Sequence, residues 1–174
     1  MSSSYPTGSL LPETAAFYPM TISVAVRRKV RTLALQSLYE LDCTNHPAQA
    51  VLTRYVEQKA IPPEAAAFLY TLVQGVLARH ADLDALIHEH APEWPVDQLS
   101  VVDRTILRIA IFEMTAVPDT PLKVAINEAV ELAKTYGSAS APRFINGVLG
   151  AVATHHAERL AAREPADPDS SPSS

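Results

Sequence analysis

The sequence predicts an all-α protein, a compact bundle of about seven helices. Hydrophobic residues make up 48% of the 174 residues but aromatic residues only 6%, so the apolar side chains are mainly Ala, Leu, Val and Ile. This composition favours packed helices over a sheet. Proline and glycine fall between the amphipathic segments rather than inside them, and their spacing indicates where the helices begin and end.

Both ends of the chain differ from the part between them. Residues 1–22 and 163–174 are rich in Ser, Thr and Pro and show no apolar periodicity. Such segments cannot bury enough apolar surface to fold, so both are expected to be disordered tails. The sequence thus predicts one all-helical domain over residues 23–162.

Four helices are expected in the first half of this domain, over about residues 23–43, 48–59, 63–80 and 81–91. The fifth begins after Ser100, whose hydroxyl is expected to cap the Asp103 amide while the Asp103 carboxylate caps in return. It continues to about Ala116. This helix is apolar on most sides, which predicts a central position in the bundle.

The sixth and seventh helices are also marked by their ends. Thr120 is the expected cap of the sixth helix, with Pro121 at its first position and Gly137 at its end. The seventh begins near Ser140, and its apolar face is predicted from Phe144, Val148, Ala151 and Val152. Gly147 and Gly150 lie inside this helix and are interpreted as sites of close helix packing.

Charge and cysteine content limit the class of protein. The net charge of −5 argues against a strongly basic nucleic-acid binder, so any RNA contact must be local or shared with a basic partner. The single cysteine, Cys43, cannot form an internal disulfide, and no signal peptide is recognisable, which predicts a cytoplasmic protein. No apolar run approaches the roughly 20 residues that span a bilayer, so no membrane role is expected.

Catalytic signatures are missing from the sequence. Its five glycines form neither a P-loop nor a dinucleotide-binding fingerprint, and there is no nucleophile elbow. His88 and His90 on one helix would point about 200° apart, and no third ligand has useful spacing, so a solvated helix end is favoured over a metal site. We therefore expect no enzyme, no cofactor and no metal.

The first helix carries a basic and aromatic strip. Its predicted buried stripe consists of Val30, Leu33, Ala34, Ser37, Leu38 and Leu41. The opposite, solvent-facing side is expected to hold Arg28, Arg31, Thr32, Leu35 and Tyr39. Arginine pairs with phosphate and tyrosine stacks on unpaired bases, so the strip suits single-stranded RNA. An ordinary solvated basic face explains the strip equally well.

Three segments resemble the NusB family of bacterial transcription antitermination factors. They are residues 27–39 (RRKVRTLALQSLY), the block from LSVVDR at 99–104 to PLKVAINEAVELAK at 121–134, and FINGVL at 144–149. The resemblance covers about residues 26–152 and is weakest between residues 47 and 91. Lys29 stands where the family often has arginine, and Leu122 where an aromatic residue is common.

The resemblance implies a NusB-like helical fold and a function in RNA binding. It implies binding to the boxA sequence of nascent transcripts, notably ribosomal RNA, together with ribosomal protein NusE, and indirect contact with the RNA polymerase elongation complex. A homodimer is a further expectation. The implied RNA-binding residues are Arg27, Arg28, Lys29, Arg31, Tyr39, Asp119 and Lys123, whereas the residues that contact NusE stay undetermined.

Two alternatives remain open. One is a helical scaffold that binds only protein, with the basic strip as plain surface. The other is a stand-alone relative of the RNA-binding module of ribosomal RNA cytosine methyltransferases. Those enzymes need a large cofactor-binding domain after the module, and this sequence shows neither strands nor a glycine-rich loop for one.

Overall fold

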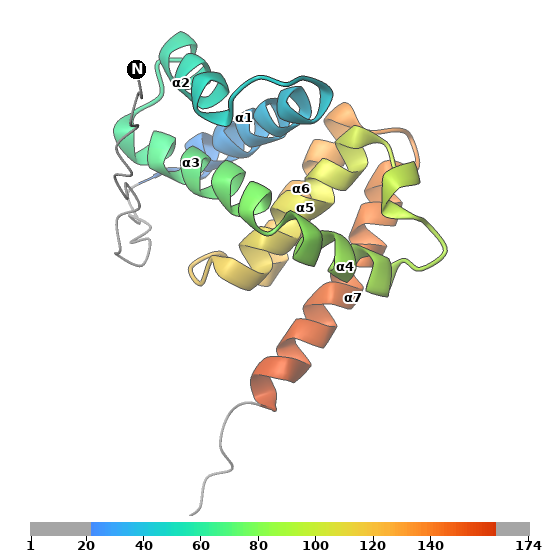
Figure 1. Ribbon diagram of the computed structural model, residues 1–174. Coiled ribbons are helices and arrows are strands. Elements are labelled where there is room, and N and C mark those ends of the chain that lie inside the picture. Colours follow the sequence, from blue (N-terminus) through green and yellow to red (C-terminus); the bar gives the residue numbers. More distant parts are fainter. Residues whose placement is uncertain (1–21, 163–174) are drawn as a thin grey trace, which may run out of the picture.

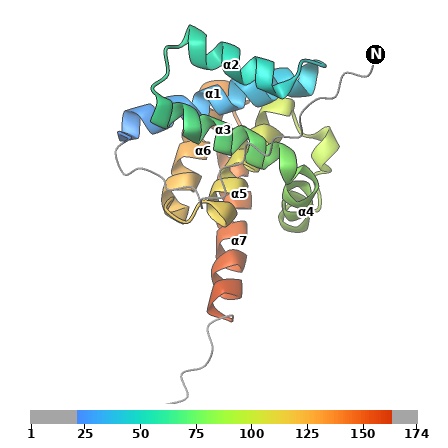
Figure 2. The same ribbon diagram turned by 60° about the vertical axis from the view of Figure 1, so that its left-hand side comes forward.

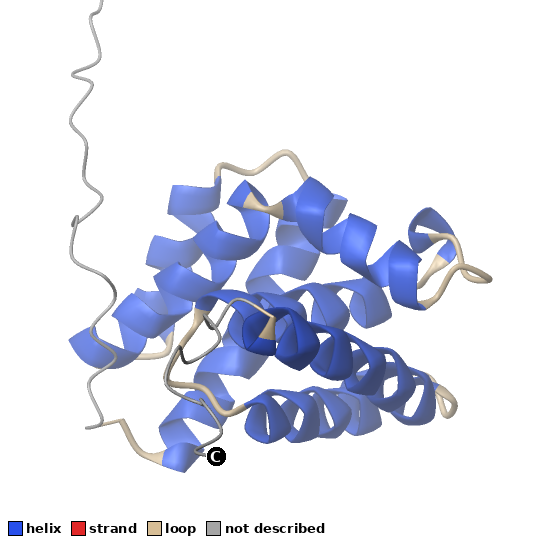
Figure 3. Ribbon diagram, turned by 90° about the horizontal axis from the view of Figure 1, so that it is seen from below, coloured by secondary structure: helices blue, strands red, loops and turns tan. Residues whose placement is uncertain are grey.

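The computed structural model describes residues 22–162, which fold into seven α-helices and one short 3-10 helix (Figure 1). The elements are α1 Val24–Cys43, α2 Ala48–Gln58, α3 Pro63–Ala78, α4 His80–His90, η1 Val96–Gln98, α5 Val101–Ala116, α6 Leu122–Tyr136 and α7 Ala141–Ala161. All regular elements of this described part are helical (Figure 3), which confirms the predicted all-α fold. Apart from Ile22, the predicted tails lie outside the described residues.

Helix α5 is the centre of the bundle, as its sequence predicted. It packs against α1, α3, α4, α6 and α7 (Figures 1 and 2). Its residues from Thr105 to Met114 are all buried. Complete burial of side chains such as Ile106, Leu107 and Ile111 contributes about 1.5–3 kcal/mol each. Each of these five helices thus turns an apolar face toward α5, whereas α2 packs on α1 and α3.

One close helix approach involves a glycine that the sequence did not single out. A Cβ atom on Gly75 of α3 would lie 2.0 Å from Cζ of Phe112 on α5. Close packing was expected at Gly147 and Gly150 instead, and that expectation is wrong, since a Cβ at either would meet nothing within 4 Å. Both lie on the side of α7 turned away from the core.

The helix ends follow local capping rules in part. The Ser23 hydroxyl accepts the amide of Val26 at 3.3 Å, and the Ser100 hydroxyl accepts the amide of Asp103 at 3.1 Å. The reciprocal half of the predicted capping box is not formed, because Asp103 Oδ1 is buried without a hydrogen-bond partner in the described part. Gly137 ends α6 as expected.

Two sequence-based details of α6 and α7 are wrong. Pro121, rather than Thr120, caps α6, and the Thr120 amide instead donates to the Val117 carbonyl at 3.2 Å in the preceding turn. On α7, Ala151 is exposed and Phe144 is only partly buried. The buried stripe is formed by Ala141, Ile145, Val148, Leu149 and Val152, because α5 and α6 pack on that side.

No helix within residues 22–162 is long and apolar enough to cross a bilayer.

Candidate nucleic-acid interface

Helix α1 shows solvent a narrower face than the sequence predicted. It packs against α2, α3 and α5, and these three neighbours cover much of its circumference. Arg31 and Leu35, both placed on the solvent side by the sequence analysis, fall inside the covered arc and are buried. The exposed arc retains Arg28, Lys29 and Tyr39.

Arg31 is an internal ion-pair partner. Its guanidinium donates from Nε to Glu113 Oε1 at 2.7 Å and from Nη2 to Glu113 Oε2 at 2.8 Å. The same group lies 5.6 Å from the centroid of the Phe68 ring. Arg31 is 4% exposed, so it does not reach a ligand at the surface. Glu113 was the available signal, because an acid within the most buried helix requires a buried cation.

Arg28 joins the start of α1 to α6 while remaining accessible. It donates from Nε to Glu128 Oε2 at 3.0 Å and from Nη2 to Glu128 Oε1 at 2.8 Å. The side chain of Arg28 is 58% exposed and that of Glu128 only 10%. The hydrogen bond to Glu128 and the negative charges of Glu128 and Glu131 raise the pKa of Arg28. In return, the hydrogen bond from Arg28 lowers the pKa of Glu128 against the opposing effect of burial.

The remaining predicted residues of α1 differ in exposure. Lys29 is exposed. Arg27 is partly buried, and its Nε atom has no hydrogen-bond partner among the described residues. Tyr39 is 46% exposed and lies 11 residues after Arg28, about 16 Å along the helix. The cationic start of α1 and its aromatic residue therefore occupy separate ends of one face.

Tyr39 lines a surface cavity that sequence reasoning missed. The cavity has a volume of about 530 Å³ and lies where α1, α2, α5 and α6 meet. Tyr136, 42% exposed at the end of α6, lies at the same cavity. Its other lining residues are Leu35, Gln36, Glu40, Tyr55, Gln58, Lys59 and Val102. In the sequence, the only sign of Tyr136 was its place as an aromatic residue at the predicted end of a helix.

The start of α6 carries the last two predicted residues. Asp119 is exposed in the turn before α6, and Lys123 is exposed in its first turn. Lys123 begins a surface stripe on α6 that continues through Asn127, Glu131 and Lys134, all exposed. The negative charge of Glu131 contributes to the raised pKa of Arg28, so this stripe runs beside the start of α1. Arg28 thus binds α6 directly.

The histidines at the end of α4 have different surroundings. His88 is exposed, as expected for a solvated helix end. A third potential ligand does exist, however, because α7 brings His155 to Glu89 and His90. Sequence spacing could not show this proximity, which depends on how α4 and α7 pack.

Comparison with known proteins agrees with this architecture. The model of the NusB family matches residues 28–154. The transcription antitermination protein NusB of Roseiflexus castenholzii is 51% identical over 137 residues, which cover 78% of this chain and 96% of that protein.

Solved structures agree as well. The structure of T. maritima NusB superposes with a TM-score of 0.72 at 29% identity, covering 77% of this chain and 94% of that one. A chain in a crystal structure of antitermination factors NusB and NusE with double-stranded RNA gives a TM-score of 0.69 at 25% identity, covering 76% and 99%. The family match and the relative that shares half of its residues lead to one conclusion: this chain belongs to the NusB family.

Proposed function

We propose that this chain is a transcription antitermination factor that binds boxA-type RNA of nascent transcripts, notably ribosomal RNA, together with ribosomal protein NusE. Through this pair it acts on the RNA polymerase elongation complex. The NusB family is non-enzymatic, so the activity is one of binding and positioning. The observation that carries the proposal is the exposed cationic start of α1, with Arg28 and Lys29, beside the polar stripe of α6.

Arg28 is well placed for a phosphate contact. An arginine has five N–H donors, and Glu128 occupies one on Nε and one on Nη2. Three donors remain for a ligand on a side chain that is 58% exposed. Because Glu128 fixes the guanidinium, little conformational entropy is lost when RNA binds. Arg28 is therefore the pre-oriented anchor of the surface.

The other predicted residues take distinct roles. Lys29 and Lys123 supply exposed positive charge for the RNA backbone, and Arg27 supports them at the helix start. Tyr39 offers an exposed ring for base stacking. The Asp119 carboxylate can accept hydrogen bonds from base amino groups. Arg31 is the exception, because it holds α1 against α5 from the inside and supports the surface without touching RNA.

Titration of labelled boxA RNA, with and without NusE, tests the proposal by fluorescence anisotropy. We expect NusE to tighten binding. Arg28→Ala is expected to weaken it about tenfold or more, as for loss of a charged hydrogen bond. Tyr39→Ala is expected to weaken it at least about fivefold through lost stacking. Arg159→Ala is the control, an exposed cation in the last turn of α7. The C-terminal end of α7 projects away from α1 (Figures 1 and 2).

The outcomes separate the alternatives. Equal affinities for Arg28→Ala, Arg159→Ala and the unmodified chain would contradict the assigned surface. Binding of NusE without any RNA contact by the pair would leave the protein-only scaffold as the function. Because the related crystal structure contains double-stranded RNA, the titration includes a duplex of the same sequence.

A further inference from the structure

The C-terminal end of α4 and a part of α7 bring together three side chains of types that commonly bind metals. Glu89 and His90 lie in the last turn of α4, and His155 lies on α7, which packs directly on α4. Ligand atoms of the three residues all lie within 4.8 Å of one another. Nδ1 of His155 is 3.7 Å from Glu89 Oε1, and the two imidazole rings have centroids 5.3 Å apart.

His90 is already held in the orientation that a metal ligand needs. Its Nδ1 lies 2.8 Å from the backbone carbonyl oxygen of Leu86, to which a protonated Nδ1 donates. This hydrogen bond leaves Nε2 as the unprotonated nitrogen with a free lone pair. Metal-bound histidines almost always donate their other ring N–H to a carbonyl or carboxylate in this way, which fixes tautomer and ring orientation.

We propose that Glu89, His90 and His155 bind one zinc ion, which clamps the end of α4 to α7. Two imidazoles and one carboxylate are a typical zinc ligand set that leaves the fourth position for water. Calcium and magnesium prefer oxygen ligands throughout and fit this set poorly. The site joins segments far apart in the sequence, which is why no spacing rule detects it.

The geometry requires only small side-chain movements. With zinc–ligand bonds of about 2.0–2.1 Å, neighbouring ligand atoms of a tetrahedral ion lie about 3.3 Å apart. The Glu89 side chain is 57% exposed and can rotate toward the histidines. The His155 side chain is less exposed, at 34%, and has less freedom to move. No backbone shift is needed to contract a set that already lies within 4.8 Å.

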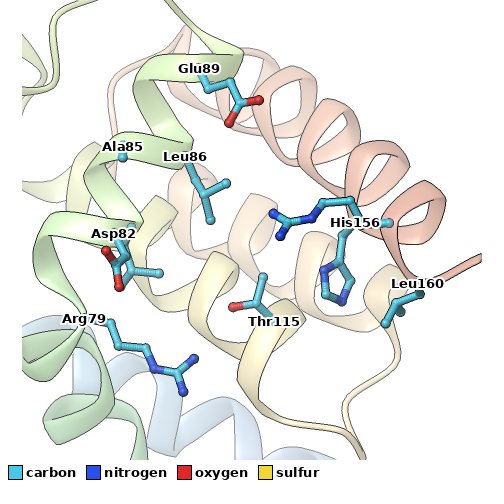
Figure 4. A pocket seen from close by; sticks show the side chains of 10 residues that line it. Arg79, Asp82, Ala85, Leu86, Glu89, Thr115, His156 and Leu160 are labelled. Carbon is cyan, nitrogen blue, oxygen red and sulfur yellow. The ribbon is translucent and has the colours of Figure 1, made fainter. Parts of the chain in front are cut away.

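A cavity beside the cluster provides a path from solvent. It has a volume of about 560 Å³ between α4 and α7, and Glu89 forms part of its wall. Figure 4 shows Glu89 of α4 at its rim, with His156 of α7 extending into it. His156 is thus a neighbour of His155 that faces the cavity without belonging to the cluster. It is a natural control.

Calorimetric titration of the full chain without an affinity tag, using Zn²⁺ alone, tests the site. We expect one ion per chain. His155→Ala, His90→Ala and Glu89→Gln should each weaken binding at least about tenfold, since loss of even an outer partner of a ligand costs about 10–100-fold. His156→Ala and His88→Ala, on the same two helices, should stay within about twofold. Circular dichroism confirms that each variant is folded.

Thermal unfolding gives a second readout that does not depend on RNA. A ligand that binds only the folded state raises the melting temperature. Zn²⁺ should therefore raise the Tm of the unmodified chain and of His156→Ala clearly more than that of His155→Ala. Absence of zinc binding by the unmodified chain, or equal losses in the His155 and His156 variants, would overturn the proposal without affecting the proposed RNA function.

Discussion

The ion pair between Arg31 and Glu113 places two opposite charges in the interior, where the Glu113 side chain is 1% exposed. Removing the cation alone leaves a buried carboxylate without compensation, which costs about 3–5 kcal/mol. We therefore expect Arg31→Met to lower the free energy of unfolding by that amount in urea denaturation. The double variant Arg31→Met/Glu113→Leu should be more stable than Arg31→Met alone, because no buried charge remains. Additive losses would contradict this account.

The pair between Arg28 and Glu128 predicts a pH dependence of stability. The hydrogen bond from Arg28 lowers the pKa of Glu128 from its ordinary value of about 4.5. A lowered folded-state pKa stabilises the fold above about pH 4.5, and this contribution is lost as pH falls through the folded value. The advantage of the unmodified chain over Glu128→Gln should therefore shrink between pH 7 and pH 3 in urea unfolding.

Arg28→Ala supplies the control for that pH dependence. Without the guanidinium, the main cause of the lowered Glu128 pKa is gone. The stability difference caused by Glu128→Gln in this background should lose most of its change with pH. An equal change in both backgrounds would mean that Arg28 does not set the pKa of Glu128.

The sequence predicts whether a single side chain is exposed only where its position on the helical wheel is enough to settle it. Arg28 and Tyr39 are exposed as the helical wheel of α1 predicted. Arg31 was misplaced, because a wheel gives the direction of a side chain but not how many neighbours surround the helix. Three helices pack on α1, so the Arg31 side chain, which was predicted to face solvent, is buried.

At the scale of elements, the contact between α3 and α5 depends on the missing side chain of Gly75. Gly75→Ala would place a Cβ 2.0 Å from the buried Phe112 ring, so the ring or the helices must move. We expect a loss of about 1–3 kcal/mol in the free energy of unfolding, as for other overpacked cores. Gly150→Ala is the matched control in a helix, with nothing within 4 Å of the new Cβ.

The control should shift stability in the opposite direction. Alanine is favoured over glycine inside a helix by about 0.5–1 kcal/mol, so Gly150→Ala is expected to stabilise the protein. Both changes are measured by urea unfolding of the same chain. Destabilisation of similar size at both positions would show that loss of glycine itself, rather than the Phe112 contact, is responsible.

The presence of each helix was largely predictable, because the residues that begin and end a helix act locally. Ser23, Ser100 and Gly137 mark observed helix ends. Thr120 was a wrong choice, since Pro121 has a fixed φ and itself occupies the cap position before Leu122. The glycines show the limit of local reasoning. Gly75 and Gly150 both lie inside apolar helices, and only the packed structure distinguishes the crowded position from the open one.

For the whole molecule, sequence reasoning identified the fold but not the connections across the bundle. Glu128 lies 100 residues from Arg28 in the sequence. His155 is likewise far along the chain from Glu89 and His90. Such pairs form because α6 and α7 return to pack beside helices from the first half of the chain. The resemblance to a family could place residues on a surface, but their partners required the three-dimensional arrangement.

The net charge of −5 makes the salt dependence of RNA binding the sharpest whole-molecule test. If Arg27, Arg28, Lys29 and Lys123 are the cations that meet phosphate, single-stranded RNA should give a slope of log K against log salt of about −3. Lys29→Ala should reduce the magnitude of this slope by about 0.7. Arg28→Ala should reduce it by less, because Glu128 already compensates the Arg28 charge.

Anisotropy titrations between 50 and 200 mM KCl, a range in which about 0.6 of a log unit in salt is covered, measure these slopes. Addition of NusE should steepen the slope if the basic partner contributes its own phosphate contacts. A slope near −3 that persists in Lys29→Ala would place the phosphate contacts on other residues. A slope that is unchanged by NusE would mean that this acidic chain binds RNA without help, against the joint surface that its charge suggests.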